Sequence, residues 1–428
     1  MATFFRIALL ALGAGLAGCA GAGTTGSERL PELDPERVAY RATLPPLLTT
    51  DEGVPVRTPE QWTGTRRREL LRLVLENEYG FMPSPPANVR ARVIQEDTGY
   101  FDGAATKKLV RLDYGPAGTP PIELLLIAPN GAPAPVILGL NFLGNHTTTD
   151  DPTIPISPHW IPERGEGVID NQATEASRGT SADRWPFREA VARGYAIATF
   201  YHGDVDPDRD DFTDGIHPHI PLNGTTGRTE TSWGTLAAWA WGMQRAVDYL
   251  AQEPLVDPAR IAVMGHSRNG KAALLAGATD ERVALVISNQ SGCGGAAISR
   301  RRLGETVQAI NTAFPHWFNE RFRTYNDRED AMPVDQHSLL ALIAPRPLLV
   351  ASAEGDTWAD PAGEFLSLVE IDPVYRLLGT DGLASPRMPG VNRLIHGDLG
   401  YHIRPGGHGV GLADWNVFMD FADDHFRR

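Results

Sequence analysis

The chain has 428 residues and a formal net charge of −14 at pH 7, because 53 Asp and Glu residues outnumber 39 Lys and Arg residues. This acidic composition, without any block of basic residues, argues against a nucleic-acid-binding protein. The only cysteines are Cys19 and Cys293. If a lipid is attached to Cys19, then Cys293 has no partner, no disulfide framework is possible and the fold must depend on its hydrophobic core.

The first residues are typical of an exported protein. An apolar run over residues 7–17 follows a weakly positive start and is too short to span a bilayer. It ends in Leu16-Ala17-Gly18-Cys19, which resembles a bacterial lipobox, a signal in which the cysteine is lipidated. We therefore predict a lipoprotein-type signal peptide at residues 1–19, a flexible tether at residues 20–35 and a single folded domain at residues 36–428. The predicted location is the periplasm or outer membrane, or outside the cell if the signal is an ordinary cleaved one.

The rest of the chain alternates between predicted strands and helices. A helix with a broad apolar face is predicted at residues 66–77. Further helices are predicted at 185–193, 233–252, 272–278 and 414–425. Strands, many of them continuously apolar, are predicted at 89–95, 107–114, 122–128, 135–141, 196–201, 260–264, 284–288, 347–351 and 392–395. This order indicates an α/β fold with a mostly parallel sheet covered on both faces, in which the closely spaced first strands are antiparallel.

Two long segments without regular periodicity interrupt this plan, at residues 144–183 and 203–231. Both are rich in Pro, Gly, Asp, Thr and His. Long loops of this kind usually carry functional residues or form lids. We expect them to wall a surface cleft, and we call them the first and second inserts.

The most informative motif is Gly265-His266-Ser267-Arg268-Asn269-Gly270-Lys271, which lies between a predicted strand and a predicted helix. A serine at the apex of a glycine-flanked strand–turn–helix is the nucleophile elbow of the α/β-hydrolase fold. The motif departs from G-x-S-x-G, because Asn269 stands where the second glycine is expected. The same letters also fit the start of a phosphate-binding P-loop, but Ala272 replaces the Ser or Thr that would ligate Mg²⁺.

A serine hydrolase also needs a histidine base and a carboxylate that orients it. Of the 12 histidines, His408 is distinguished by Pro405-Gly406-Gly407-His408-Gly409, a flexible loop before the last helix. The chain order Ser, acid, His places the acid after the predicted strand 347–351, where Asp356 is the first choice. Glu354 and Asp360 are its competitors. The backbone N–H of Arg268 would form part of the oxyanion hole, and its guanidinium would add positive charge there unless a structural carboxylate pairs with it.

The chain resembles the glucuronoyl esterases, carbohydrate esterase family 15, from about residue 60 to the C-terminus. The motifs that carry the resemblance are Ser267-Arg-Asn-Gly-Lys271, Trp239-Ala-Trp-Gly242, Ser291-Gly-Cys-Gly-Gly295 and Glu78-Tyr-Gly-Phe-Met-Pro83. The resemblance implies cleavage of the ester between a xylan glucuronic acid and a lignin alcohol, without metal or cofactor, by a monomer. It implies a Ser267 nucleophile, a His408 base and an Arg268 oxyanion contact. It also implies sugar contacts from Lys271, Glu305 and Trp358.

One departure from the family concerns the acid. Many members carry Glu where this chain has Gln290, in Gln290-Ser291-Gly292. A neutral amide cannot stabilise an imidazolium by charge, so the acid falls to Asp356, and Gln290 is left as a hydrogen-bonding residue near the substrate. An acetyl or feruloyl esterase on the same fold is the alternative enzyme, and a lipid-anchored glycan-binding protein is the non-catalytic alternative.

Overall fold

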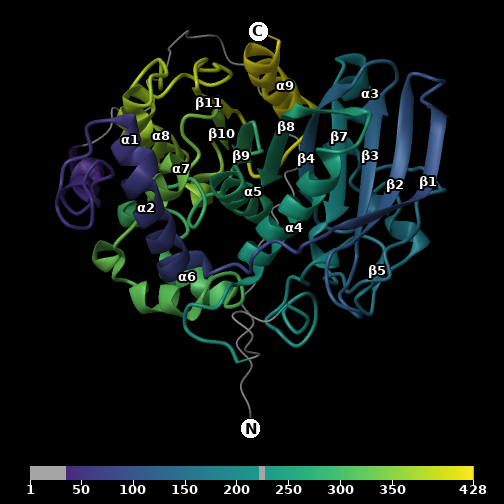
Figure 1. Cartoon of the computed structure of the whole chain (residues 1–428), viewed down its shortest axis with the longest axis horizontal. Coiled ribbons are helices and arrows are strands. Elements are labelled where there is room, and N and C mark those ends of the chain that lie inside the picture. Colours follow the sequence, from purple (N-terminus) through teal and green to yellow (C-terminus); the bar gives the residue numbers. More distant parts are fainter. Residues whose placement is uncertain (1–34, 221–226, 428) are drawn as a thin grey trace, which may run out of the picture.

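The computed structural model describes residues 35–220 and 227–427. Cys19, the predicted signal peptide and nearly all of the predicted tether lie outside these ranges. The described residues form a nine-stranded sheet in the order β1-β2-β3-β7-β4-β8-β9-β10-β11, which runs from right to left in Figure 1. The strands are β1 (Arg90–Tyr100), β2 (Ala105–Asp113), β3 (Ile122–Pro129), β4 (Ala134–Asn141), β7 (Ala196–Tyr201), β8 (Val256–His266), β9 (Leu285–Asn289), β10 (Leu348–Ala353) and β11 (Leu399–Arg404).

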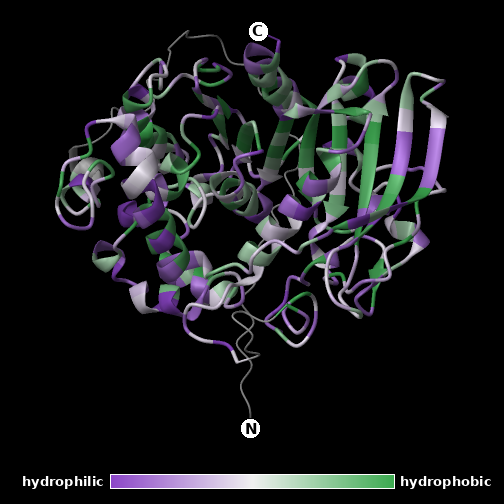
Figure 2. Ribbon diagram, viewed as in Figure 1, coloured by the Kyte–Doolittle hydropathy of each residue, from purple (hydrophilic) through white to green (hydrophobic). Residues whose placement is uncertain are grey.

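The strand directions confirm the predicted mostly parallel sheet. Strand β1 pairs with β2, β2 with β3 and β3 with β7 in antiparallel fashion, whereas β7, β4, β8, β9, β10 and β11 are parallel neighbours. In Figure 2 the central strands are hydrophobic along most of their length, and β1 and β2, the two strands at one end of the sheet, carry hydrophilic stretches. Parallel strands need cover on both faces, which accounts for their continuous apolar sequences.

Helices cover both faces of the sheet and make a three-layer sandwich. The helices are α1 (Pro59–Gln61), α2 (Arg67–Val74), α3 (Phe187–Ala192), α4 (Thr235–Leu250), α5 (Arg268–Thr279), α6 (Val307–Ala313), α7 (Gln336–Ala341), α8 (Pro361–Leu377) and α9 (Leu412–Phe426). Ile261 and Val263 of β8 belong to the core shared with α2, α4, α5, α7 and α8. Ala262 and Met264, which point to the other face, belong to the core shared with α3 and α9. This alternation follows from the two-residue period of a strand.

The last strand was predicted at the wrong place, and the longest helix was missed. The last strand lies at Leu399–Arg404, not at residues 392–395, where Ile395 makes only an isolated bridge to Tyr401. The 17-residue helix α8 was not predicted, because Pro373 inside it disrupts the helical signal in the sequence. Asp360 begins this helix, since its carboxylate accepts a hydrogen bond from the backbone of Gly363.

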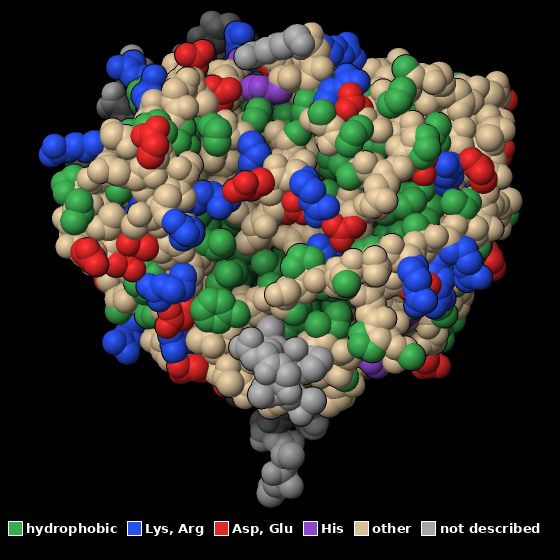
Figure 3. All heavy atoms as spheres, viewed as in Figure 1, with side chains coloured by type: hydrophobic (Ala, Val, Ile, Leu, Met, Phe, Trp, Pro, Cys, Tyr) green, Lys and Arg blue, Asp and Glu red, His purple; other side chains and the backbone are tan. Residues whose placement is uncertain are grey.

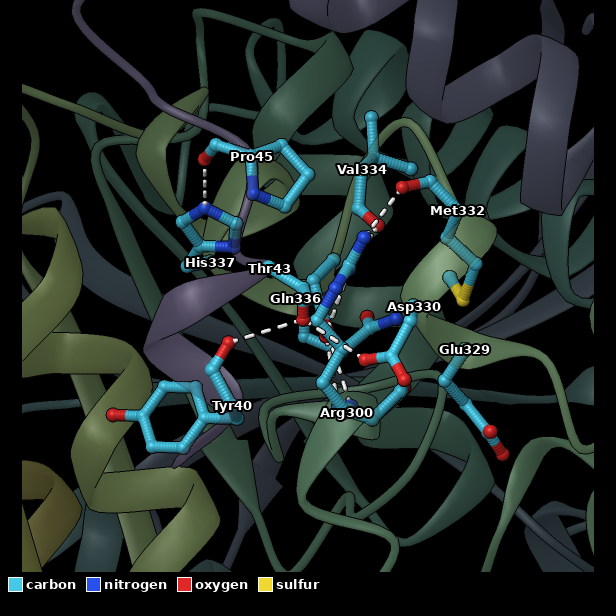
Figure 4. Close-up of polar contacts among 12 residues, drawn as sticks. Tyr40, Thr43, Pro45, Arg300, Glu329, Asp330, Met332, Val334, Gln336 and His337 are labelled. Carbon is cyan, nitrogen blue, oxygen red and sulfur yellow. Dashed lines mark hydrogen bonds and ion pairs between the residues drawn. The ribbon is translucent and has the colours of Figure 1, made fainter. Parts of the chain in front are cut away.

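A buried polar cluster ties the first described residues to the body of the protein (Figure 4). Arg300 donates to the backbone carbonyls of Met332 and Val334 and forms an ion pair with Asp335. Beside it, the Nε2 of His337 contacts the carbonyl of Pro45 at 2.9 Å. These contacts give hydrogen-bond and ion-pair partners to polar groups that would otherwise be costly to bury. The cluster therefore has a structural role.

Charged side chains of both signs are mixed on the surface. Figure 3 shows Lys and Arg side chains interspersed with Asp and Glu on the face in view, without an extended patch of either sign. Among the residues that the structure describes, no helix is both long and apolar enough to cross a membrane.

Candidate active site

The predicted elbow is present at the carboxyl end of β8. Strand β8 ends at His266, helix α5 begins at Arg268, and Ser267 between them has φ 58° and ψ −130°. A serine with positive φ is strained, and such strain persists where the surrounding structure holds it. Here the backbone N–H of Ser267 donates to the carbonyl of Asn289 at 2.9 Å, which fixes the turn to strand β9. The turn therefore lifts Ser267 above the sheet edge, where its side chain is partly exposed.

The glycines around the turn account for the departure from the usual motif. A Cβ atom on Gly265 would lie 1.9 Å from the carbonyl oxygen of Asn269, so no other residue fits there. Gly270 is less tightly enclosed, with a Cβ position 3.0 Å from both the Gly265 carbonyl oxygen and Ser291. A small residue is thus favoured at 270. Asn269 instead donates from its amide to the carbonyl of Leu140 at 3.0 Å.

The loops after the last two strands bring Asp356 and His408 together. Oδ2 of Asp356 lies 2.6 Å from Nδ1 of His408. The Asp356 side chain is 5 % exposed and that of His408 is 45 % exposed. The His408 ring also lies 4.5 Å from the ring of His266, the residue before Ser267. A buried carboxylate on Nδ1 directs the other ring nitrogen outward as a proton acceptor, which is the arrangement that a serine hydrolase requires.

Backbone contacts hold these two loops against each other. The N–H of Gly355 donates to the carbonyl of Gly406 at 2.9 Å. Arg404 donates to the carbonyls of Gly407 and Gly409, on either side of His408. The glycine-rich loop that carries His408 is therefore held in one conformation, although its sequence alone suggests flexibility.

Gln290 supports the same loop. Its side-chain oxygen accepts from the N–H of Gly409 at 2.9 Å, and its amide nitrogen donates to the Gly409 carbonyl at 2.9 Å. Only 1 % of Gln290 is exposed, so the geometry favours a part in positioning the His408 loop over direct contact with substrate. Only a side chain with both a donor and an acceptor can make this pair of bonds.

Arg268 is paired with a buried carboxylate from the second insert. Its Nη1 donates to Oδ2 of Asp208, and its guanidinium lies 4.6 Å from the ring of Trp317. Oδ1 of Asp208 accepts from His316 Nε2 at 2.9 Å and from the Trp317 indole at 2.8 Å. Burial alone would raise the pKa of Asp208, but these hydrogen bonds and the Arg268 charge hold it well below its usual range. The Nε of Arg268 is buried and has no hydrogen-bond partner.

Lys271, Glu305 and Trp358 lie next to one another. Lys271 is 3 % exposed, and its ammonium donates to the carbonyls of Ser291 and Cys293. Oε2 of Glu305 is 3.5 Å from the same ammonium, and the N–H of Glu305 donates to the carbonyl of Trp358 at 2.8 Å. Trp358 itself is 58 % exposed, an unusual position for so large an apolar side chain. Of the three, Trp358 is therefore the most open to a ligand.

A second buried carboxylate supports the loop that follows β9. Glu364 of α8 accepts from the N–H of Gly292 at 3.0 Å and from the hydroxyl of Ser352 at 2.6 Å. Burial raises the pKa of Glu364 to about 8, and the charge of Asp356 adds to this effect. Burial therefore favours the neutral form of Glu364, which supports this loop through its hydrogen bonds.

The sequence did not predict Asp208, His316, Trp317 and Glu364 near the site. Asp208 belongs to the acid-rich run Asp204–Asp211, in which nothing distinguishes one carboxylate from its neighbours. Among the described residues, no group of three or more His, Cys, Asp or Glu side chains is placed to hold a metal ion.

Known proteins are similar to this chain over most of its length. A family model for fungal glucuronyl esterases matches residues 188–379. The carbohydrate esterase MZ0003, from an unknown prokaryotic organism, is 46 % identical over 387 residues, which are 90 % of this chain and 89 % of that protein. The chain belongs to carbohydrate esterase family 15. The members of this family are carboxylic ester hydrolases.

Solved structures of family 15 enzymes agree with the fold. A promiscuous family 15 esterase from a marine bacterial metagenome superposes with a TM-score of 0.84 at 45 % identity, covering 89 % of this chain and 96 % of that one. The glucuronoyl esterase from Solibacter usitatus gives a TM-score of 0.83 at 43 % identity, covering 89 % and 97 %. Both confirm the α/β-hydrolase fold predicted from the sequence.

Proposed function

We propose that this family 15 enzyme hydrolyses esters of glucuronic acid or 4-O-methyl-glucuronic acid, such as those between xylan side groups and lignin alcohols. The proposal is supported by the strained elbow at Ser267, with Arg268 as the next residue, and by the Asp356–His408 pair, whose imidazole lies 4.5 Å from that of His266. A solved family 15 enzyme from Sporotrichum thermophile, 23 % identical, was crystallised with methyl 4-O-methyl-β-D-glucopyranuronate. The same fold alone would also suit an acetyl or feruloyl esterase.

The proposed mechanism has two steps. His408 accepts the proton of Ser267 as its Oγ attacks the ester carbonyl, and Asp356 stabilises the resulting imidazolium. The backbone N–H and guanidinium of Arg268 face the oxyanion. The tetrahedral intermediate then collapses, His408 gives the proton to the departing alcohol, and a glucuronoyl ester remains on Ser267. Water, deprotonated by His408, attacks this ester and releases the acid and the free serine.

The surrounding residues are proposed to bind the sugar. Trp358 would pack against the pyranose ring, because its indole is largely exposed at the site. Glu305 would accept hydrogen bonds from sugar hydroxyls. Two N–H groups of Lys271 donate to backbone carbonyls, which leaves one N–H to face either Glu305 or the sugar.

Substrate preference tests this function. We expect purified protein to hydrolyse benzyl glucuronate with a kcat/KM at least roughly tenfold above its value for benzyl acetate, since the sugar contacts contribute only to the first. The measurement is initial rates with both esters, with Ser267→Ala as the blank. Equal rates on both esters, or higher activity on acetylated xylan, would favour the general esterase instead.

We further propose that the enzyme is exported and held to a membrane by a lipid on Cys19. The support is the apolar run over residues 7–17 that ends at this cysteine. Wild-type protein should then partition with membranes, and Cys19→Ala should be found in the soluble fraction. Membrane association that survives this change would exclude the lipid anchor.

A further inference from the structure

A second arginine contacts the carboxylate that pairs with Arg268. Oδ2 of Asp208, which accepts the hydrogen bond from Arg268, lies 3.5 Å from Nη2 of Arg164. Arg164 comes from the first insert, and Asp208 from the second. The Arg164 side chain is 59 % exposed, whereas that of Arg268 is 13 % exposed and that of Asp208 is 2 % exposed. The two inserts therefore place one buried and one exposed guanidinium on the same carboxylate oxygen.

The charges around this oxygen do not balance. Asp208 can neutralise only one of the two guanidinium groups. Lys271 and Glu305 offset each other across 3.5 Å. His202 stays neutral at pH 7, because burial lowers its pKa to about 4. The negative charge of Asp208 raises this pKa, but burial has the larger effect. One of the two guanidinium groups is thus left without a counter-charge of its own. The excess positive charge lies on the exposed side of Asp208, next to Arg268.

This excess charge suits the product of the proposed reaction better than the substrate. The ester group of the substrate is uncharged. Hydrolysis of the acyl-enzyme gives a uronate, whose carboxylate would lie beside Arg268. We propose that Arg164 and Arg268 together form a two-guanidinium site that binds the carboxylate of the released uronic acid. This inference rests on the proposed function, which supplies the uronate, and assigns a role to a residue of the first insert.

Two features of the site support carboxylate binding. A guanidinium presents paired N–H donors that match a carboxylate, and such charge-assisted bonds are stronger than neutral ones. The second feature is access, because the Arg164 side chain is 59 % exposed and a ligand can reach its guanidinium. A neutral amide in place of the carboxylate would keep the shape of the sugar and lose the charge.

The test compares glucuronate with glucuronamide by titration calorimetry. We expect wild-type protein to bind glucuronate more tightly than glucuronamide, and Arg164→Ala to weaken glucuronate binding by roughly three- to tenfold, in the range of a partly exposed ion pair. Glucuronamide affinity should change less than about twofold, since an exposed charge adds little to binding a neutral group. The matched control is Arg188→Ala, because Arg188 is 64 % exposed and makes a similarly loose ion pair with Asp102 at 3.8 Å.

Three results would overturn the inference: equal affinity of the wild type for both ligands, equal losses for both in Arg164→Ala, or the same loss of glucuronate binding in Arg188→Ala. Neither ligand is an ester, so the titration does not depend on turnover. Failure to hydrolyse benzyl glucuronate would contradict the proposed function, whereas failure to distinguish glucuronate from glucuronamide would contradict only the site proposed for its carboxylate.

Discussion

Asparagine in place of Asp356 is expected to lower kcat for benzyl glucuronate by about 10⁴-fold, the loss found when the acid of a serine triad becomes an amide. The Asp356 carboxylate lies 2.6 Å from Nδ1 of His408. An amide there removes the charge that stabilises the imidazolium and allows the wrong tautomer of the ring. The measurement is kcat and KM from initial rates, and KM should change little because Asp356 is not expected to touch the sugar.

The matched control is Glu354→Gln, which removes an exposed carboxylate two residues away and should leave kcat within about twofold, as expected for a surface change. Gln290→Glu tests the other candidate position. A carboxylate there can accept from the N–H of Gly409 but cannot donate to its carbonyl. We therefore expect the double variant Asp356→Asn, Gln290→Glu to remain as slow as Asp356→Asn. Near-wild-type kcat in Asp356→Asn would show that Asp356 is not the required acid. Recovery of wild-type kcat in the double variant would show instead that a carboxylate at position 290 can replace it.

Alanine in place of Arg268 is expected to lower kcat by about 10²- to 10³-fold, the loss seen when one oxyanion donor is removed. The guanidinium is preorganised, because Asp208 binds one end and Trp317 lies 4.6 Å away. It therefore needs little rearrangement when negative charge develops on the carbonyl oxygen. The backbone N–H of residue 268 survives the substitution, so some oxyanion stabilisation should remain.

Stability has to be measured alongside this variant. Arg268→Ala leaves the buried Asp208 without its closest cation, and breaking a buried ion pair typically destabilises a protein by about 3–5 kcal/mol. Asp208→Asn is the matched variant, since it breaks the same pair and keeps the guanidinium at the site. We expect similar losses of thermal stability in both variants, and a much smaller loss of kcat in Asp208→Asn. A folded Arg268→Ala protein with kcat within threefold of Asp208→Asn would contradict the oxyanion role.

Most of the sheet could be predicted because buried parallel strands have continuous apolar sequences. Strand β4, for example, is buried at every position. Strand β11 was misplaced because Gly400, His402 and Arg404 interrupt its apolar pattern. The tertiary structure explains two of these residues. A Cβ at position 400 would lie 2.4 Å from the ring of Phe421, so glycine is needed there. Arg404 donates hydrogen bonds to the loop that carries His408. Strand signals weaken where a strand also serves the site.

The sequence by itself determined the elbow at Ser267, because its requirements are local. Gly265 and Gly270 are small where the strand and the helix nearly touch, and these contacts lie within six residues of one another. It also singled out Asp356 and His408, each on the loop after a strand. Only the tertiary structure decided the partners: Asp208 lies 60 residues before Arg268, and Gln290 lies 119 residues before Gly409. Charge and hydrogen-bond complementarity act through space, so no local pattern records which buried carboxylate meets which guanidinium.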